Sequence, residues 1–289
     1  MSAPAATPHA RLRPDERERF LGDWPTIEKV LVSFLKNEVE KAGFARVVLG
    51  LSGGIDSALA AAIAVRAFGP GGVLGVIMPH ARSNPASAAD AALVAREFGF
   101  DTATVDITRQ IEAYFETEPD ASHVRRGNKM SRERMSILYD LSAARTALVL
   151  GTSNKTELLL GYGTLYGDMA CAVNPVGDLY KTQVRALSRQ MKIPERVIEK
   201  PPSADLWEGQ SDEGDLGFTY DEVDQLLFLI VDCRLTRKEA VERGFSDAFV
   251  AKVETLVRRS QFKRRLPTIA KISGRTVTND FLYARDWGS

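Results

Sequence analysis

A short stretch rich in glycine and serine carries the first residues whose types and spacing suit chemistry. It follows an apolar run, precedes an alanine-rich helical pattern, and consists of Gly50, Leu51, Ser52, Gly53, Gly54, Ile55, Asp56 and Ser57. Small residues let backbone N–H groups approach an anion closely, and the N-terminus of the following helix adds partial positive charge. The two serine hydroxyls can donate further hydrogen bonds. We therefore interpret this stretch as a phosphate-binding loop.

The aspartate in this loop needs a separate explanation, because a carboxylate repels phosphate. Asp56 makes sense if it holds a divalent cation that bridges to the phosphates. The loop lacks the Walker signature of P-loop proteins, and the chain contains no G-x-G-x-x-G. An ordinary dinucleotide cleft therefore loses support.

Two other interpretations of the loop stay open at this point. Residues 50–54 match the G-x-S-x-G nucleophile elbow of α/β hydrolases, whose mechanism needs a histidine late in the chain. The only histidines are His9, His80 and His123, which counts against a hydrolase. The second interpretation is a glycine-rich turn without chemistry, although a turn alone does not need two serines and an aspartate.

The elements around the loop alternate between apolar strands and helical patterns. The predicted strands are short apolar runs of the buried type, at residues 47–51, 73–78, 102–107 and 147–152. Helical spacing predicts helices at 27–42, 56–68, 88–98, 108–118 and 129–146. This alternation implies an α/β fold, a doubly wound parallel sheet with helices on both faces. Ligands of such sheets bind beyond the carboxyl ends of the strands, where the turns 52–57 and 152–157 lie.

The chain changes character after residue 200. Residues 201–232 contain nine acidic and no basic side chains, and solvated surface is one interpretation of that run. Helical patterns resume at 220–231, 236–243 and 247–262. We therefore expect an added C-terminal helical region beside the sheet.

Composition excludes several classes of protein. The 289 residues include 38 basic and 38 acidic side chains, a balance that argues against a dedicated nucleic-acid binder. No apolar run is long enough for a membrane span, and the N-terminus lacks the apolar core of a secretory signal. Cys171 and Cys233 offer no disulfide framework, so we expect a cytoplasmic protein. We predict a disordered N-terminal tail over 1–22 and a C-terminal tail over 271–289.

A second polar segment follows the fourth predicted strand and carries a specific resemblance. Residues 151–168 read Gly-Thr-Ser-Asn-Lys-Thr-Glu-Leu-Leu-Leu-Gly-Tyr-Gly-Thr-Leu-Tyr-Gly-Asp, and this run closely resembles NAD synthetase. Residues 52–57 resemble the pyrophosphate-binding loop of the N-type ATP pyrophosphatases, the superfamily to which that family belongs. Further similar motifs occur in the same order at 127–135, 174–175, 178–184 and 201–206.

The resemblance implies a Rossmann-like sheet of the adenine nucleotide alpha hydrolase type and one synthetase domain over residues 23–270. It also implies a ligase that amidates deamido-NAD (nicotinate adenine dinucleotide) with ammonia. This ATP-dependent reaction passes through an adenylate and gives NAD, AMP and pyrophosphate, as the final step of NAD biosynthesis. The family resemblance further implies a homodimer.

The source of nitrogen is expected to be ammonia. Glutamine-dependent members of the family carry an additional amide-hydrolysing domain, whereas this chain has only about 25 residues before its synthetase-like part. We therefore expect free ammonia, or ammonia from a separate partner. Because water would destroy an acyl adenylate, we expect mobile segments to close over the site, with 82–87 and 204–216 as the candidates.

Adenylation brings a carboxylate and a triphosphate together, so positive charge must offset their repulsion. Asp56 and Glu157, at the ends of adjacent strands, could share Mg²⁺ between the phosphates. Lys181 resembles the lysine with which the family binds ATP phosphates, and Thr152 and Ser203 resemble its hydroxyl ligands of ATP. We assign Asp56 and Lys181 to catalysis as well.

Asp168 completes the predicted catalytic residues, because it could orient the substrate or receive a proton from ammonia. Each assignment has a plainer alternative. Glu157 could be an acid favoured by the dipole in the first turn of a helix. Lys181 could be a solvated helix lysine, and Asp168 could cap a turn.

The predicted deamido-NAD contacts also come from the resemblance, and several depart from the family pattern. Arg132 matches the arginine that meets the dinucleotide. Leu165 stands where many stand-alone members have Lys, and Ala172 stands where they have Asp. Phe262 and Lys263 replace a His-Lys pair, so Lys263 keeps its charge while Phe262 must bind differently, for example by stacking.

Two other classes of function remain open from the sequence. One is another enzyme of the superfamily, such as a tRNA thiolase or a lysidine-forming ligase, against which the zero net charge and the lack of Cys-x-x-Cys sites count. The other is a non-catalytic nucleotide-binding module. The paired acids Asp56 and Glu157 count against that module, since storing ATP does not need both.

Overall fold

A sheet of four parallel strands lies at the centre of the protein. The computed structural model describes residues 11–203, 205, 210–265, 267–277 and 280–281. The strand order is β3-β2-β1-β4, with β1 at Val47–Gly50, β2 at Val73–Ile77, β3 at Asp101–Thr104 and β4 at Leu148–Val149. Val47 pairs with Val73 on one side and with Leu148 on the other. The chain thus winds in both directions from β1, which confirms the predicted doubly wound parallel sheet.

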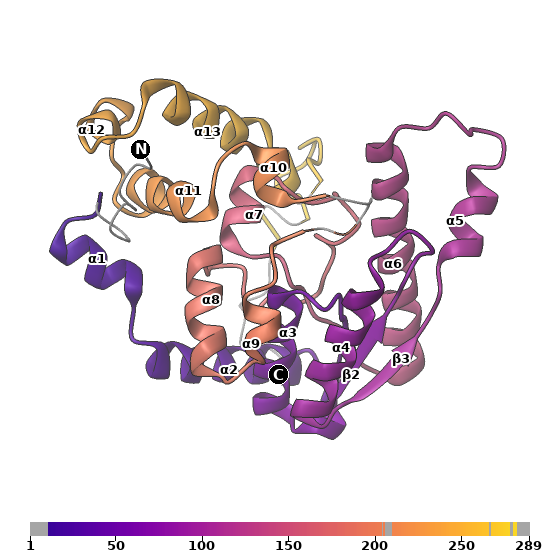
Figure 1. Ribbon diagram of the computed structural model, residues 1–289. Helices are drawn as coiled ribbons and strands as arrows, with labels where there is room; N and C mark the ends of the chain where they lie inside the picture. The colour runs from indigo at the N-terminus through magenta and orange to yellow at the C-terminus, as the bar shows by residue number, and fades with distance from the viewer. Residues whose placement is uncertain (1–10, 204, 206–209, 266, 278–279, 282–289) are drawn as a thin grey trace.

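Helices cover both faces of this sheet (Figure 1). Val47 and Leu49 of β1 belong to one apolar core, and Val48 between them belongs to another, because successive side chains of a strand point to opposite faces. The first core includes residues of α2 (Trp24–Lys41), α3 (Ile55–Phe68), α4 (Pro85–Phe98), α8 (Lys181–Gln190) and α9 (Glu195–Ile198). The second includes residues of α5 (Thr108–Tyr114) and α6 (His123–Arg145).

Two strands are shorter than predicted, although their hydrogen bonding continues. The third was expected over 102–107, and β3 ends at Thr104, but Val105 and Ile107 still donate backbone hydrogen bonds to the segment that continues β2. The fourth was expected over 147–152, and β4 spans two residues. Beyond it, Leu150 forms an isolated parallel bridge with Val173.

A separate apolar core confirms the predicted C-terminal helical region. It lies among α7 (Lys155–Leu160), α10 (Asp212–Leu216), α11 (Tyr220–Leu227), α12 (Arg237–Glu242) and α13 (Asp247–Arg259). A π-helical turn, Phe228–Asp232, continues α11. Tyr180 and Tyr220 are its largest fully buried side chains. Because Tyr180 immediately precedes α8, this core adjoins the helices that cover the sheet (Figure 1).

The predicted disorder of residues 1–22 is wrong for the segment that forms α1, Pro14–Leu21. Phe20 is only 1% exposed, and its ring lies 5.8 Å from that of Tyr180 and 5.2 Å from that of Phe228. Glu16 forms a 2.7 Å ion pair with Arg243. Helical periodicity is not apparent in this segment, because α1 is highly charged and is stabilised by tertiary contacts. Residues 1–10 and 282–289 of the predicted tails lie outside the described part.

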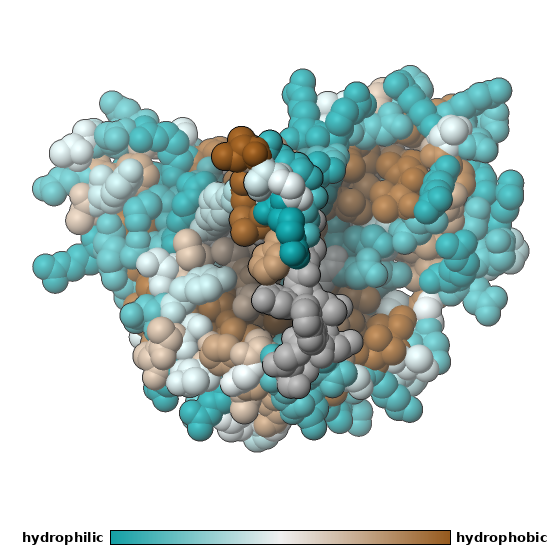
Figure 2. Space-filling view, turned by 180° about the vertical axis from the view of Figure 1, so that it is seen from behind, coloured by the Kyte–Doolittle hydropathy of each residue, from teal (hydrophilic) through white to brown (hydrophobic). Residues whose placement is uncertain are grey.

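One face of the molecule is largely hydrophilic, with apolar residues in separate patches (Figure 2). Large exposed apolar side chains in the described ranges include Val124, Phe262 and Ile272. In the part of the chain that the structure describes, no helix combines the length and apolar character needed to cross a bilayer.

Replacing Phe20 with Ala tests whether α1 belongs to the folded core. We expect the free energy of unfolding to fall by about 3–5 kcal/mol, because a buried aromatic ring is lost. Leu21→Ala is the matched control, since the adjacent side chain is 38% exposed and should change stability little. Chemical denaturation measures both variants. Equal effects of the two substitutions would contradict the packing of α1.

Candidate active site

The predicted phosphate loop joins β1 to α3 and packs closely against α4. Gly53 has φ +76°, and a Cβ atom added there would lie 2.1 Å from the carbonyl oxygen of Ser87. This position needs glycine for its left-handed backbone and for the approach of α4. The loop is therefore fixed in place by the fold, whatever it binds.

The two loop serines hydrogen-bond within the loop. The Oγ atoms of Ser52 and Ser57 lie 3.1 Å apart, and Ser57 Oγ donates to the carbonyl oxygen of Gly54 at 3.0 Å. Ser57 is buried, whereas Ser52 is exposed. Ser57 therefore shapes the loop, and Ser52 is the hydroxyl that a phosphate can reach.

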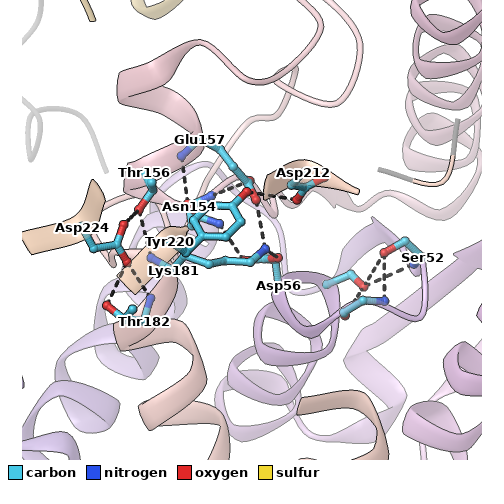
Figure 3. A network of polar contacts seen from close by, with 12 residues as sticks. Ser52, Asp56, Asn154, Thr156, Glu157, Lys181, Thr182, Asp212, Tyr220 and Asp224 are labelled. Carbon is cyan, nitrogen blue, oxygen red and sulfur yellow. Dashed lines mark hydrogen bonds and ion pairs between the residues drawn. The ribbon is translucent and has the colours of Figure 1, made fainter. Parts of the chain in front are cut away.

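The centre of the site is a lysine between two carboxylates (Figure 3). Lys181 Nζ lies 2.5 Å from Asp56 Oδ2 and 3.1 Å from Glu157 Oε1, and Lys181 is only 3% exposed. Asp56 and Glu157 lie in the first turns of α3 and α7, and Lys181 is the first residue of α8. The structure thus brings together three predicted residues from three separate helix starts.

An asparagine that the sequence analysis did not select connects the two carboxylates. Asn154 Nδ2 donates to Asp56 Oδ1 at 2.8 Å, and Asn154 Oδ1 accepts the backbone N–H of Glu157 at 3.0 Å. Glu157 Oε2 accepts the backbone N–H of Asn154 in return, which completes a capping box. Glu157 is thus an acid in the first turn of a helix, as the plainer alternative proposed. The same position places its carboxylate beside Lys181. The N-x-x-E spacing was the signal that could have identified Asn154.

The site holds more negative than positive charge. Asp212 is 4% exposed, its Oδ2 accepts the Tyr220 hydroxyl at 3.0 Å, and its Oδ1 has no hydrogen-bond partner among the described residues. Burial, with help from Asp56 and Asp212, raises the pKa of Glu157 to about 8. Burial alone lowers the pKa of Lys181, but the two carboxylates outweigh it and raise that pKa. An added cation would therefore be stabilised here.

The donor set suits a cation that also takes ligands from a substrate. Across the described ranges, no group of three or more acidic, His or Cys side chains is arranged to hold a metal ion by itself. Magnesium usually binds through one or two carboxylates together with phosphate oxygens and water. Asp56 and Glu157, which converge on one ammonium group, match that requirement.

A second group of predicted residues lies around the loop 161–168. Arg132 Nε donates to the carbonyl oxygen of Leu165 at 3.2 Å, and Lys263 Nζ donates to those of Gly161 and Gly163 at 2.8 and 2.7 Å. Burial lowers the pKa of Lys263. Three of the residues predicted to bind deamido-NAD are therefore gathered at one loop.

Asp168 caps this loop. Its Oδ1 accepts the Ser131 hydroxyl at 2.6 Å and the backbone N–H of Thr164 at 2.9 Å. The plainer alternative for Asp168, a turn cap, is therefore correct. Because Asp168 is also exposed, a role toward the substrate stays a prediction.

The other predicted residues are more dispersed. Thr152 follows β4 and is half-buried, and the exposed Ala172 donates its N–H to the carbonyl oxygen of Val149 at 2.9 Å. Phe262 is 63% exposed in the short 3-10 helix Gln261–Arg264. Ser203 is exposed, and its Oγ accepts the N–H of Asp205 at 3.1 Å.

The two predicted lids touch each other in the described part of the chain. The backbone N–H of Asn84 donates to Asp205 Oδ1 at 3.1 Å. Residues 212–216 of the second lid form α10, whereas 204 and 206–209 lie outside the described residues. The closure of segments 82–87 and 204–216 over a ligand stays a prediction.

Comparisons with known proteins identify one family. The family model described as NAD synthase matches residues 27–267. The NH(3)-dependent NAD(+) synthetase of Trichlorobacter lovleyi is 58% identical over 262 residues, which cover 91% of this chain and 96% of that protein.

Two solved structures share the fold. The NH3-dependent NAD synthetase of Campylobacter jejuni, in complex with a nitrate ion, has a TM-score of 0.74 and 35% identity, covering 86% of this chain and 100% of that one. The NMN synthetase of Francisella tularensis has a TM-score of 0.75 and 31% identity, covering 86% and 99%. With a family match across most of its length, the chain belongs to the NAD synthase family.

Proposed function

We propose that the chain is the ammonia-dependent ligase that completes NAD biosynthesis, using ATP to amidate deamido-NAD and releasing AMP and pyrophosphate. The family match and the names of its relatives support this activity. The main structural support is a position for positive charge between the carboxylates of Asp56 and Glu157, which the ammonium group of Lys181 occupies. That position lies beside the loop at residues 50–57, which receives the pyrophosphate.

ATP binds at the carboxyl ends of β1 and β4. Backbone N–H groups at the start of α3 and the exposed Ser52 hydroxyl face the phosphates, while Thr152 and Ser203 contact the nucleotide. Asp56 and Glu157 would hold Mg²⁺ together with phosphate oxygens, and the ion, when bound, supplies charge that offsets the approach of two anions. Lys181 adds a fixed positive charge at the same place.

The reaction has two steps. The nicotinate carboxylate of deamido-NAD attacks the α-phosphorus of ATP, and pyrophosphate leaves. Ammonia then attacks the carbonyl carbon of the acyl adenylate, loses a proton, and expels AMP, which is a better leaving group than the original carboxylate oxygen. Asp168, exposed at the loop that Arg132 and Lys263 support, accepts that proton or orients the substrate.

The dinucleotide occupies the second group of residues, which contains Arg132, Leu165 and Lys263. Ala172 and Phe262 complete its predicted contacts. The Phe262 ring is 63% exposed, which supports a site that a second copy of the chain completes. We therefore propose a homodimer. A cytoplasmic location is supported by two cysteines that are both free.

Purified protein with ATP, Mg²⁺, deamido-NAD and an ammonium salt tests the activity. We expect pyrophosphate release that requires deamido-NAD, with NAD as the product, and much slower turnover with glutamine. Because a structural neighbour is named NMN synthetase, nicotinate mononucleotide is assayed in parallel. Absence of release dependent on deamido-NAD would refute the proposal, and faster release with the mononucleotide would change the substrate.

The substitution Asp56→Asn tests the cation position. We expect kcat to fall by about a hundredfold or more, because one of two charges that hold the metal is lost while the shape is kept. Asp101→Asn, at the exposed start of β3, is the control and should retain activity. Steady-state kinetics and circular dichroism measure both. Normal turnover by the Asp56 variant would remove its metal role.

Glu157→Gln tests the electrostatics of the free protein. Because burial raises the pKa of Glu157 from 4.5 to about 8, the folded state binds this proton more tightly than the unfolded state. The carboxylate therefore costs stability progressively as pH rises through that window. We expect the variant to gain stability relative to the parent at pH 8 compared with pH 5, and to lose activity. Chemical unfolding of both proteins without ligands, at pH 5 and pH 8, measures their stabilities. If the difference in stability between variant and parent does not change with pH, burial does not raise the pKa of Glu157.

A further inference from the structure

We infer that Asp224 is a positioning residue that holds the helix starts carrying Glu157 and Lys181 in the relative placement that adenylation needs. The inference rests on the proposed function, because it assigns Asp224 a role in that same site. Asp224 lies in α11, in the helical region outside the sheet, and is fully buried.

The carboxylate of Asp224 accepts three hydrogen bonds from two different helices (Figure 3). Its Oδ1 accepts the Thr156 hydroxyl at 2.5 Å. Its Oδ2 accepts both the backbone N–H and the hydroxyl of Thr182, each at 2.8 Å. One side chain therefore ties the first turn of α7 to the first turn of α8.

The residues that Asp224 binds are immediate neighbours of the site residues. Thr156 precedes Glu157, and Thr182 follows Lys181. Thr156 Oγ1 also accepts the backbone N–H of Lys181 at 3.0 Å, so the two helix starts are joined directly as well. These bonds fix the backbone from which the Lys181 and Glu157 side chains reach each other at 3.1 Å. A displacement near 1 Å at such a site can slow a reaction by about a hundredfold.

The same helix supports the site at a second point. The ring of Tyr220, at the start of α11, lies 5.3 Å from Lys181 Nζ, and its hydroxyl donates to Asp212. α11 thus packs Tyr220 against Lys181, and it links the starts of α7 and α8 through Asp224. This explains how helices outside the sheet contribute to a site at its edge.

An ionised carboxylate matches this contact pattern, because all three hydrogen bonds run from the threonines to its oxygens. A proton on either oxygen turns that oxygen into a donor toward a threonine, so at least one of these bonds must reverse or break. Burial raises the pKa of Asp224 to about 6, against the three hydrogen bonds that lower it, and Asp221 on the same helix adds to the increase. The hydroxyl of Tyr180, before α8, faces the same carboxylate, and its pKa is raised by burial with a contribution from Asp224. These hydrogen bonds are therefore weakened progressively as pH falls through the pKa of Asp224.

The test is ATP–pyrophosphate exchange dependent on deamido-NAD, without ammonia, between pH 5 and pH 8. Leaving ammonia out removes the titration of ammonium from the profile. We expect Asp224→Asn to lower the maximal exchange rate about tenfold or more while the KM for deamido-NAD stays nearly constant. We expect the exchange rate of the parent to fall as pH drops through about 6, and we expect this fall to be absent or shifted in the variant. Asp221→Asn is the matched control, one turn away with a side chain 72% exposed. It should keep the parental maximal rate and shift the pH profile only slightly toward lower pH, because Asp221 contributes to the raised pKa of Asp224.

Thr182 provides a second pair of variants, which decides the question if Asp224→Asn does not fold. Thr182→Ser keeps the hydroxyl and should retain more exchange activity than Thr182→Val, which removes it. A parental exchange rate and pH profile in Asp224→Asn, or equal activity of the two Thr182 variants, would overturn the inference. Absence of exchange in the parent protein would instead overturn the proposed function.

Discussion

The ammonium group of Lys181 lies buried between the carboxylates of Asp56 and Glu157, and the rest of the site is arranged around that contact. Burying charge is unfavourable unless opposite charge and hydrogen bonds accompany it. Here one ammonium faces two carboxylates, with the buried Asp212 nearby. Burial, with a contribution from Asp56 and Asp212, raises the pKa of Glu157, and the excess of carboxylates favours an additional cation. A site that is short of positive charge when empty is suited to a substrate that arrives with a metal ion.

The fold supplies that contact by directing three helix starts to one edge of the sheet. Parallel strands deliver their connections to the same edge, which places Asp56 after β1 and Glu157 after β4. Asn154 links the two carboxylates, and Asp224 reaches from α11 to link α7 with α8. The helical region is therefore part of the site and not only a neighbour of it.

The sequence was sufficient to predict the sheet, the loop and the pairing of Asp56 with Glu157, because these depend on local patterns and strand alternation. The buried role of Asp224 was not predictable, since it is one of nine acidic residues in a run whose composition suggests solvated surface. Burial of a single member depends on tertiary packing that the composition does not encode. For the same reason α1 was missed: its one buried ring, Phe20, gives no periodic signal. Asp168 was predicted to orient the substrate or to accept a proton, with a turn cap as the alternative; its hydrogen bonds show the turn cap, and the role toward the substrate stays a prediction.

The most direct measurement is a crystal structure of the protein with Mg²⁺ and a non-hydrolysable ATP analogue. We predict one metal ion in contact with both Asp56 and Glu157 and with phosphate oxygens, and a terminal diphosphate against the loop at residues 50–57. A triphosphate bound away from that loop, or a metal ion touching neither carboxylate, would contradict this prediction.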